Sequence, residues 1–413
     1  MSTAVQTPSI GIAGQSVTTR IVSIDIFRGL VMVVMIFVNE LASVQGLPWW
    51  NYHMKANVDA MTYVDMVYPA FLFIVGMAIP LAVKQRLKNN GSLPLLWMHV
   101  VLRTISLVVM GLILANARKG DPGRMGLSTN AWVLLGLSGA VLFWSVYGGS
   151  NRGRVAHRFL RFLGLALMIA MFVIFRRTTH SGQAAWIDGK YPEILGLIGY
   201  TYLAACILYI PTRRWLWAPV AWFVALTALC ALSTAGWLGL GLARHVPLYF
   251  FPFGNGAMAS ITMAGVVTSS IFLGRHRWQS VRQKMLFAAA FVYATLVAGW
   301  LMTPLGISKI RATPTWSLYS IAASVLLFMA LYWICYVKKK TAWAFFARPA
   351  GSNTLLTYLL PDFYYFIVAW LGFTYFDRHY NFGWPGAVRA AVFTAIILLF
   401  ASVLTKWKVR LQL

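Results

Sequence analysis

Long apolar runs separated by short polar segments occur along almost the whole chain. Each run has roughly 20 residues, which is the length that an α-helix needs to cross the hydrocarbon core of a bilayer. A backbone inside that core must satisfy its own hydrogen bonds, so such runs predict helices. They predict twelve membrane-crossing helices, at 22–43, 61–83, 93–116, 131–147, 157–175, 191–210, 214–235, 255–273, 285–303, 315–337, 353–373 and 386–405. A count of ten stays open, since two of the shorter runs have the length of re-entrant or interfacial segments.

The same pattern sets the expected domain organisation. Residues 1–20 are rich in Ser, Thr, Gln and Gly and contain no Lys or Arg before Arg20, unlike the basic start of a signal peptide. We therefore expect 1–20 to be a disordered cytoplasmic tail and 21–413 to form a single transmembrane domain. The predicted fold class is all-α: a polytopic integral membrane helix bundle of 10–12 transmembrane helices, with both termini in the cytoplasm.

Composition excludes most other classes of protein. Hydrophobic residues make up 60% of the chain and charged residues 11%, whereas a soluble domain carries roughly 25% charge. A net charge of +26 would suggest a nucleic-acid partner in a soluble protein. Here the basic residues lie in short loops between apolar runs, so the expected partner is the lipid bilayer and no nucleic acid is expected. The three cysteines lie inside apolar runs without the spacing of a metal site, and no metal is expected.

The distribution of charge predicts the orientation of the helices. With the N-terminus inside and the twelve runs alternating, 23 of the 35 basic residues fall on the inner side and the remaining 12 outside. Cytoplasmic loops carry such an excess of Lys and Arg. The expected location is therefore a plasma membrane (the bacterial inner membrane), crossed many times, with the loop after the first helix outside.

Ionisable side chains in or near membrane spans are costly, so each is a candidate functional residue. Asp25 and Arg28 are three positions apart and share a helix face at the cytoplasmic interface. They are either a structural pair at a helix start or an entry site for a charged cytosolic ligand. Asn39, near the outer end of the same helix, either joins helices or orients a substrate group.

The loop after the first helix contains a histidine among aromatic residues. On position alone, His53 is either an ordinary solvated side chain or a group for proton chemistry. Asp65 begins the next helix, where an acid is favoured in any case. It is also placed to hold one nitrogen of the His53 ring while the other nitrogen exchanges protons.

These residues carry a resemblance to a known family. Ser23–Leu30 and Asp65–Gly76 resemble the transmembrane acyltransferase family of heparan-alpha-glucosaminide N-acetyltransferase and its bacterial relatives. The present chain resembles a bacterial-type homologue without the lumenal domain. Further stretches are similar in the same order, and the resemblance spans most of 21–360. They are the span around Arg103, the Glu193–Gly199 stretch, Lys309 with Thr315-Trp316-Ser317, and the Gly351–Leu356 stretch that contains Asn353.

The resemblance implies an enzyme. It implies an acetyl-CoA-dependent transmembrane acyltransferase that moves an acetyl group from cytosolic acetyl-CoA, a co-substrate, to an extracytoplasmic acceptor. The acceptor expected for the family is an amino sugar or sugar hydroxyl of a glycan. His53 matches the family's outward-facing catalytic histidine, as a general base or an acyl carrier. Asp65 is expected to support it, and Asn39 to donate a hydrogen bond to the thioester carbonyl.

The resemblance also places the binding residues at the two ends of the bundle. Asp25, Arg28, Arg103 and Asn353 are expected to bind CoA, because basic side chains at the inner mouth suit its phosphates. The residues expected to contact the acceptor are Glu40, Trp50, Lys309 and Trp316. A homodimer is left open.

Two other functions compete with this interpretation. In an ion-coupled small-molecule transporter, Asp25, Arg28, Asp65 and Asp362 would line a coupled-ion path. In the second alternative, the protein is a non-catalytic partner in the assembly of an envelope glycan. Composition alone favours the transporter, and the resemblance favours the enzyme.

Overall fold

The structure is a computed structural model that describes residues 22–147, 154–237, 252–274 and 280–413. The predicted tail 1–20 lies outside the described residues. Helices dominate the described part, which confirms the predicted all-α, polytopic membrane helix bundle. The twelve long helices are α1 Val22–Leu41, α2 Tyr63–Asn90, α3 Leu93–Ala115, α5 Thr129–Trp144, α6 Arg154–Ile174, α7 Glu193–Thr212, α8 Ala218–Thr234, α9 Ala257–Leu273, α10 Val281–Leu301, α11 Pro314–Tyr332, α13 Thr354–Leu371 and α15 Gly383–Lys406.

Short elements connect these helices. They are the helices α4 Pro122–Met125, α12 Arg348–Ser352 and α14 Tyr375–His379, the 3-10 turns η1 Trp49–Asn51, η4 Thr303–Leu305 and η6 Ala342–Ala344, and the π-helical turn η5 Trp333–Val337. The strands β1 Arg177–Thr178 and β2 Ala184–Ala185 form a small antiparallel hairpin. In its register Arg177 faces Ala185 and Thr178 faces Ala184.

The twelve long helices coincide with the twelve predicted runs. The largest difference is at α2, which ends at Asn90 rather than at 83. The polar residues after 83 continue the helix, and Gly91 ends it with φ +61°, a conformation that glycine adopts without strain. Nine of the helices in the described residues are long and apolar enough to cross a membrane, while α5, α8 and α9 have 16 or 17 residues. Since 17 residues span only about 25 Å, a count of twelve crossings stays a prediction.

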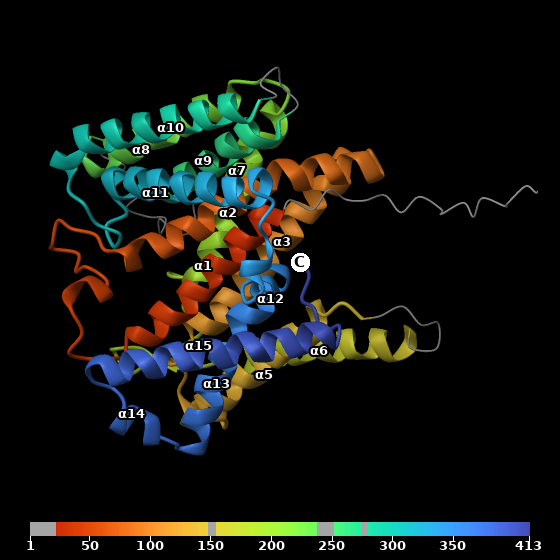
Figure 1. The fold of residues 1–413 in the computed structure, drawn as a ribbon. Coiled ribbons are helices and arrows are strands. Elements are labelled where there is room, and N and C mark those ends of the chain that lie inside the picture. Colours follow the sequence, from red (N-terminus) through yellow and green to blue (C-terminus); the bar gives the residue numbers. More distant parts are fainter. Residues whose placement is uncertain (1–21, 148–153, 238–251, 275–279) are drawn as a thin grey trace, which may run out of the picture.

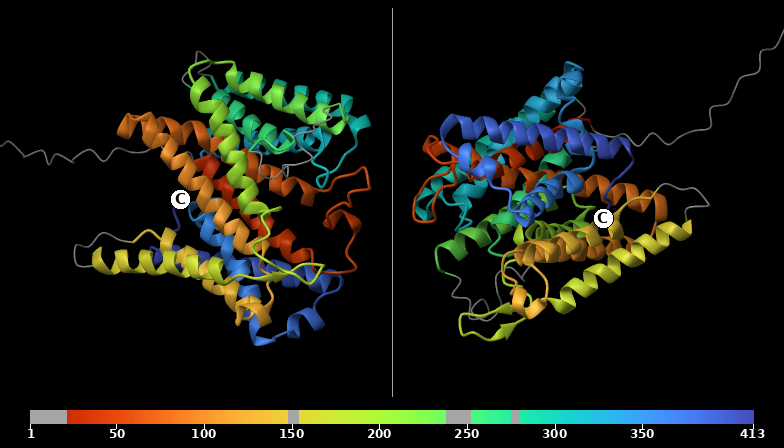
Figure 2. Two further views of the ribbon diagram at one scale, coloured as in Figure 1. Left: turned by 180° about the vertical axis from the view of Figure 1, so that it is seen from behind. Right: turned by 90° about the horizontal axis from the view of Figure 1, so that it is seen from below.

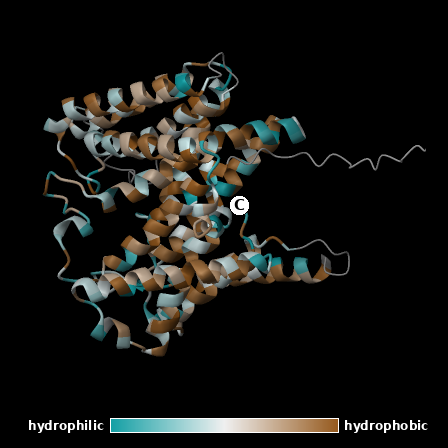
Figure 3. Ribbon diagram, in the orientation of Figure 1, coloured by the Kyte–Doolittle hydropathy of each residue, from teal (hydrophilic) through white to brown (hydrophobic). Residues whose placement is uncertain are grey.

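Figure 1 shows the helices in two groups. Helices α8 to α11 lie nearly side by side at the top, and α5, α6, α13 and α15 lie at the bottom, with α1, α3 and α7 running obliquely between them. Figure 2 shows the same arrangement from behind and from below. In Figure 3 the hydrophobic colour follows the helices and much of the hydrophilic colour gathers at their ends and in the loops.

Consecutive long helices run between two opposite ends of the bundle. At one end, the loop 42–62 after α1 meets the segment before α15, where Gln45 N–H donates to the carbonyl oxygen of Asn381 at 2.9 Å. At the opposite end, the segment after α5 meets the last residues, where Val146 N–H donates to the carbonyl oxygen of Arg410 at 2.8 Å. We call these the His53 end and the Asp25 end.

Glycines allow the closest helix crossings. A Cβ atom at Gly76 of α2 would overlap the carbonyl oxygen of Thr262 in α9, and one at Gly265 of α9 would overlap that of Phe73 in α2. Lipid is as apolar as a leucine side chain, so helices in a membrane associate through such close van der Waals packing. This crossing fixes the middle of α2, the helix that carries Asp65, against α9.

Candidate functional site

The loop 42–62 is fixed by its own polar contacts. The Tyr52 hydroxyl donates to the carbonyl oxygen of Val44 at 2.9 Å and accepts from the N–H of Leu47 at 3.0 Å. The hydroxyl of Thr62 donates to the carbonyl oxygen of Tyr52 at 2.9 Å. These bonds hold the residue after Tyr52, which is His53, beside the first turn of α2.

Asp65 lies in that first turn and is buried. Its Oδ2 accepts the backbone N–H of Thr62 at 3.1 Å, in a capping box at the start of the helix, and that of Met54 at 3.3 Å. Its Oδ1 lies 2.7 Å from Nδ1 of His53. The carboxylate is thus held in one orientation by the helix that it caps.

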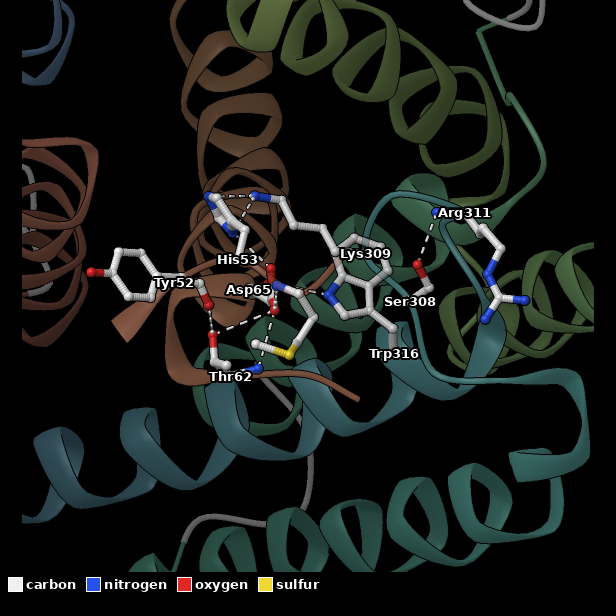
Figure 4. A network of polar contacts seen from close by, with 9 residues as sticks. Tyr52, His53, Thr62, Asp65, Ser308, Lys309, Arg311 and Trp316 are labelled. Carbon is white, nitrogen blue, oxygen red and sulfur yellow. Dashed lines mark hydrogen bonds and ion pairs between the residues drawn. The ribbon is translucent and has the colours of Figure 1, made fainter. Parts of the chain in front are cut away.

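The structure brings His53 and Asp65 together, as the sequence analysis expected. A carboxylate can only accept, so Nδ1 of His53 donates in this pair, and in the neutral ring Nε2 is then the nitrogen with the lone pair. The His53 side chain is 40% exposed whereas that of Asp65 is 1% exposed. Figure 4 shows the ring facing both Asp65 and the amine of Lys309. The arrangement provides an accessible nitrogen base backed by a buried carboxylate.

Lys309 reaches the same histidine from a loop that is distant in sequence. Its Nζ lies 3.2 Å from Nε2 and 3.3 Å from Nδ1 of His53. Because these distances are nearly equal, the amine does not lie in line with a single lone pair. Burial lowers the pKa of Lys309, and the charge of Asp65 partly opposes this. The Lys309 amine thus stands beside the ring, next to the place where a reacting group would approach Nε2.

The loop 306–313 that carries Lys309 is closed on itself and tied to its neighbours. Ser308 N–H donates to the hydroxyl of Thr313 at 3.0 Å, and the side-chain amide of Asn255 donates to the carbonyl oxygen of Ala312 at 2.9 Å. The guanidinium of Arg311 forms an ion pair with Asp59 of the loop 42–62. This ion pair joins the two loops that carry His53 and Lys309.

Two tryptophans predicted to contact the acceptor occupy different environments. Trp316 is fully buried, and its indole N–H donates to the backbone carbonyl oxygen of Asp65 at 3.0 Å. It therefore positions the start of α2 from behind rather than facing the exposed side of His53. Trp50 is 45% exposed, and its ring lies 6.2 Å from that of Tyr63.

Asn39 and Glu40, at the end of α1, lie outside this cluster. Asn39 is exposed, and no hydrogen bond links either side chain to His53, Asp65 or Lys309 in the part of the chain that the structure describes. Glu40 is buried in an ion pair with Arg389 at 3.0 Å and accepts from the hydroxyl of Tyr365. It lines a cavity of about 960 Å³ between α13 and α15.

The residues predicted to bind CoA lie toward the opposite end. Arg28 pairs with Asp25 at 3.4 Å, and it also donates to the carbonyl oxygen of Gly351 at 3.3 Å. The guanidinium of Arg103 lies 4.8 Å from the centre of the Tyr202 ring. The predicted pair of Asp25 and Arg28 is therefore present, and Arg28 additionally joins α1 to α12.

Asn353, the fourth residue predicted to bind CoA, has its amide engaged within the protein. It donates to the carbonyl oxygen of Val409 at 2.8 Å and to the hydroxyl of Thr405 at 3.2 Å, and it accepts from the N–H of Leu411 at 3.3 Å. Asn353 is 2% exposed. It holds the last segment of the chain against α12 and α13.

Sequence reasoning missed the contacts that join the loops. Asp59 and Arg311 are 252 positions apart, and each looks like an ordinary polar loop residue. Apart from its position in an aromatic loop, nothing in the sequence indicated that Tyr52 fixes this loop. Among the described residues no group of three or more His, Cys, Asp or Glu is arranged to hold a metal ion, and the absence of a metal stays a prediction.

Comparisons with known proteins relate the chain to two groups. The profile of a family described as a domain of unknown function (DUF5009) matches residues 20–240. Heparan-alpha-glucosaminide N-acetyltransferase of Mus musculus is 33% identical over 102 residues, which are 25% of this chain and 15% of the relative. The Homo sapiens protein of the same name is 33% identical over 97 residues, 24% of this chain and 14% of the relative. These matches thus cover about one seventh of the length of the curated relatives. Since the profile covers more than half of its length, the chain belongs to the DUF5009 family.

Proposed function

We propose that this protein is a membrane-embedded acetyltransferase that uses acetyl-CoA as a co-substrate and His53 as its central catalytic residue. The observation that carries the proposal is the contact of 2.7 Å between His53 Nδ1 and the buried Asp65, with Lys309 beside the same ring. The similarity to heparan-alpha-glucosaminide N-acetyltransferase supports transfer of an acetyl group. The proposed acceptor is an amino sugar or sugar hydroxyl of an extracytoplasmic glycan.

In the proposed reaction His53, Asp65 and Lys309 each have one role. The acceptor amine or hydroxyl attacks the thioester carbonyl carbon and gives its proton to Nε2 of His53. Asp65 then stabilises the imidazolium through Nδ1, and the Lys309 ammonium stabilises the oxyanion of the tetrahedral intermediate. The C–S bond breaks, and the CoA thiolate takes the proton from His53. An acetyl-histidine intermediate is the variant in which Nε2 itself attacks the carbonyl carbon.

The binding residues are assigned to the two ends in this proposal. Arg28 and Arg103 bind CoA phosphates from the cytoplasm, with Asp25 orienting Arg28 and Asn353 holding the neighbouring chain segment in place. Asn39 is exposed and lies outside the cluster around His53, so Lys309 rather than Asn39 is proposed to stabilise the carbonyl oxygen. Glu40, with its cavity of about 960 Å³, and the exposed Trp50 are proposed to contact the acceptor.

The test separates binding from transfer. We expect desulfo-CoA to raise the unfolding temperature of the purified protein, and the wild type to release CoA from acetyl-CoA when D-glucosamine is the probe acceptor. His53→Ala should keep the thermal shift and lose CoA release. His180→Ala, at an exposed loop histidine, is the matched control and should keep both.

Two outcomes would contradict the proposal. Rapid CoA release by His53→Ala would place the base elsewhere. The absence of any thermal shift with CoA, together with solute uptake by proteoliposomes that depends on Asp362, would favour the ion-coupled transporter.

A further inference from the structure

A groove on the outside of the bundle runs between α1, α12 and α15, which pack against one another. Figure 1 shows α12 and α15 beside the C-terminus. One part of the groove is a cavity of about 500 Å³ and the other a cavity of about 490 Å³. Both are lined by Phe345, Pro349 and Ser402, so they form one continuous feature, which we call the α1–α15 groove.

The part toward the Asp25 end is basic. Its charged lining residues are Asp25, Arg348, Lys406 and Arg410, and the three cations are exposed. Asp25 is already paired with Arg28, which does not line the groove. The Arg348 guanidinium donates to the carbonyl oxygen of Thr341 at 2.9 Å. The three cations therefore leave a surplus of positive charge facing one space, which suits a phosphate group.

The other part is apolar and lies along the middle of α15. This part, which we call the trough, is lined by the small residues Ala391 and Ala395 and by larger apolar residues that include Leu398 and Val33. Because α1 and α15 are among the membrane-crossing helices, this part lies at the depth of the hydrocarbon chains. Its shape and chemistry suit one acyl chain.

We propose that the α1–α15 groove binds an anionic glycerophospholipid. The phosphate lies against Arg348, Lys406 and Arg410, and an acyl chain lies along Ala391 and Ala395. Basic pockets between transmembrane helices on the cytoplasmic side bind acidic lipid headgroups in this way. CoA also carries phosphates, but it has no long chain to occupy the apolar half, so the continuity of the two halves favours the lipid.

The experiment compares two lipids with the same acyl chains. Purified protein is titrated with dioleoyl-phosphatidylglycerol or dioleoyl-phosphatidylcholine, and bound lipid is counted by native mass spectrometry. We expect the anionic lipid to bind about tenfold more tightly or better. Arg348→Gln/Lys406→Gln/Arg410→Gln should abolish this preference, and Ala395→Trp, at an exposed position, should weaken both lipids by filling the trough.

A second triple variant controls for the loss of charge alone. Lys88→Gln/Arg158→Gln/Arg282→Gln removes three exposed cations at the same end of the bundle, none of which lines the groove. It should keep the preference for phosphatidylglycerol. An equal loss in both triple variants would overturn the proposal, as would a wild type that does not distinguish the lipids. So would displacement of phosphatidylglycerol by soluble desulfo-CoA, because the groove would then be a nucleotide site.

Discussion

Asp65 performs two tasks with one carboxylate. One oxygen caps α2 through the N–H of Thr62, and the other meets the ring of His53. A residue that caps the start of the helix is thereby placed to orient a base. Trp316 also has two roles, because its ring is part of the buried core and its indole N–H binds the backbone carbonyl oxygen of Asp65. The geometry of the exposed histidine thus depends on buried groups behind it.

The first prediction separates the charge of Asp65 from its shape. Asp65→Asn keeps an oxygen for the helix cap but turns an N–H or a neutral oxygen toward Nδ1. We expect kcat for acetyl transfer to fall by up to roughly 10⁴-fold, the loss seen when the buried carboxylate behind the histidine of a Ser-His-Asp triad is changed to an amide. The thermal shift with desulfo-CoA should be unchanged. Asp121→Asn, at an aspartate that caps the short helix α4, serves as the control, and a kcat for Asp65→Asn as high as this control would remove Asp65 from the mechanism.

The second prediction concerns the pH dependence of stability at Lys309. Burial holds the pKa of Lys309 below its value of 10.5 in the unfolded chain. Between the two pKa values the unfolded state binds more protons, so this residue makes the free energy of unfolding rise with pH. Below the folded-state pKa the penalty for the buried cation is fully present.

Lys309→Met removes that penalty. We expect the variant to be more stable than the wild type near pH 7, with the difference shrinking as the pH approaches 10.5. Chemical denaturation at a series of pH values measures it. A difference that grows with pH would show the opposite sign and contradict the burial of this amine.

At the scale of elements, the helices were predictable and their long-range partners were not. Apolar length alone gave twelve runs that coincide with twelve helices, because a membrane span must satisfy its backbone locally. The contact of His53 with Asp65 was also predictable, since one short loop joins them. The approach of Lys309 could be expected only from the family resemblance and not from the local pattern, because it depends on a loop 256 positions away and on its ion pair through Arg311.

The third prediction tests the crossing of α2 and α9. Gly265→Leu would push a side chain into the backbone of Phe73. Overpacking costs about 1–3 kcal/mol, and more where backbone must move, so we expect a lower unfolding temperature and less folded protein. Ala289→Leu, at an exposed position of α10, places the same leucine side chain toward lipid and should leave both unchanged. Wild-type stability of Gly265→Leu would show that this close approach is not required.

At the scale of the whole molecule, the two ends have different tasks. The His53 end gathers the proposed catalytic residues, and the Asp25 end gathers most of the basic side chains. Charge bias predicts that the Asp25 end faces the cytoplasm. The proposed enzyme requires this arrangement, because its donor and acceptor come from opposite sides.

The fourth prediction tests sidedness directly. In a background without native cysteines, Val58→Cys lies at the His53 end and Lys88→Cys at the Asp25 end, both at exposed positions. A membrane-impermeant maleimide added to intact cells should label Val58→Cys at once and Lys88→Cys only after permeabilisation. The reverse pattern would invert the topology and exclude a cytosolic donor at the Asp25 end.

The bonds of Asn353 set an order of events during biosynthesis. Its amide donates to the carbonyl oxygen of Val409, 56 positions later, and the N–H of Val146 donates to the carbonyl oxygen of Arg410. A ribosome delivers residues to the membrane from the N-terminus, so α5 and α12 are inserted well before these partners leave the exit tunnel. Until translation reaches them, both sites hold unpaired polar groups. These two contacts therefore form only after residues 409 and 410 have been synthesised, and ribosome stalling before residue 409 would leave an incomplete bundle exposed to membrane proteases.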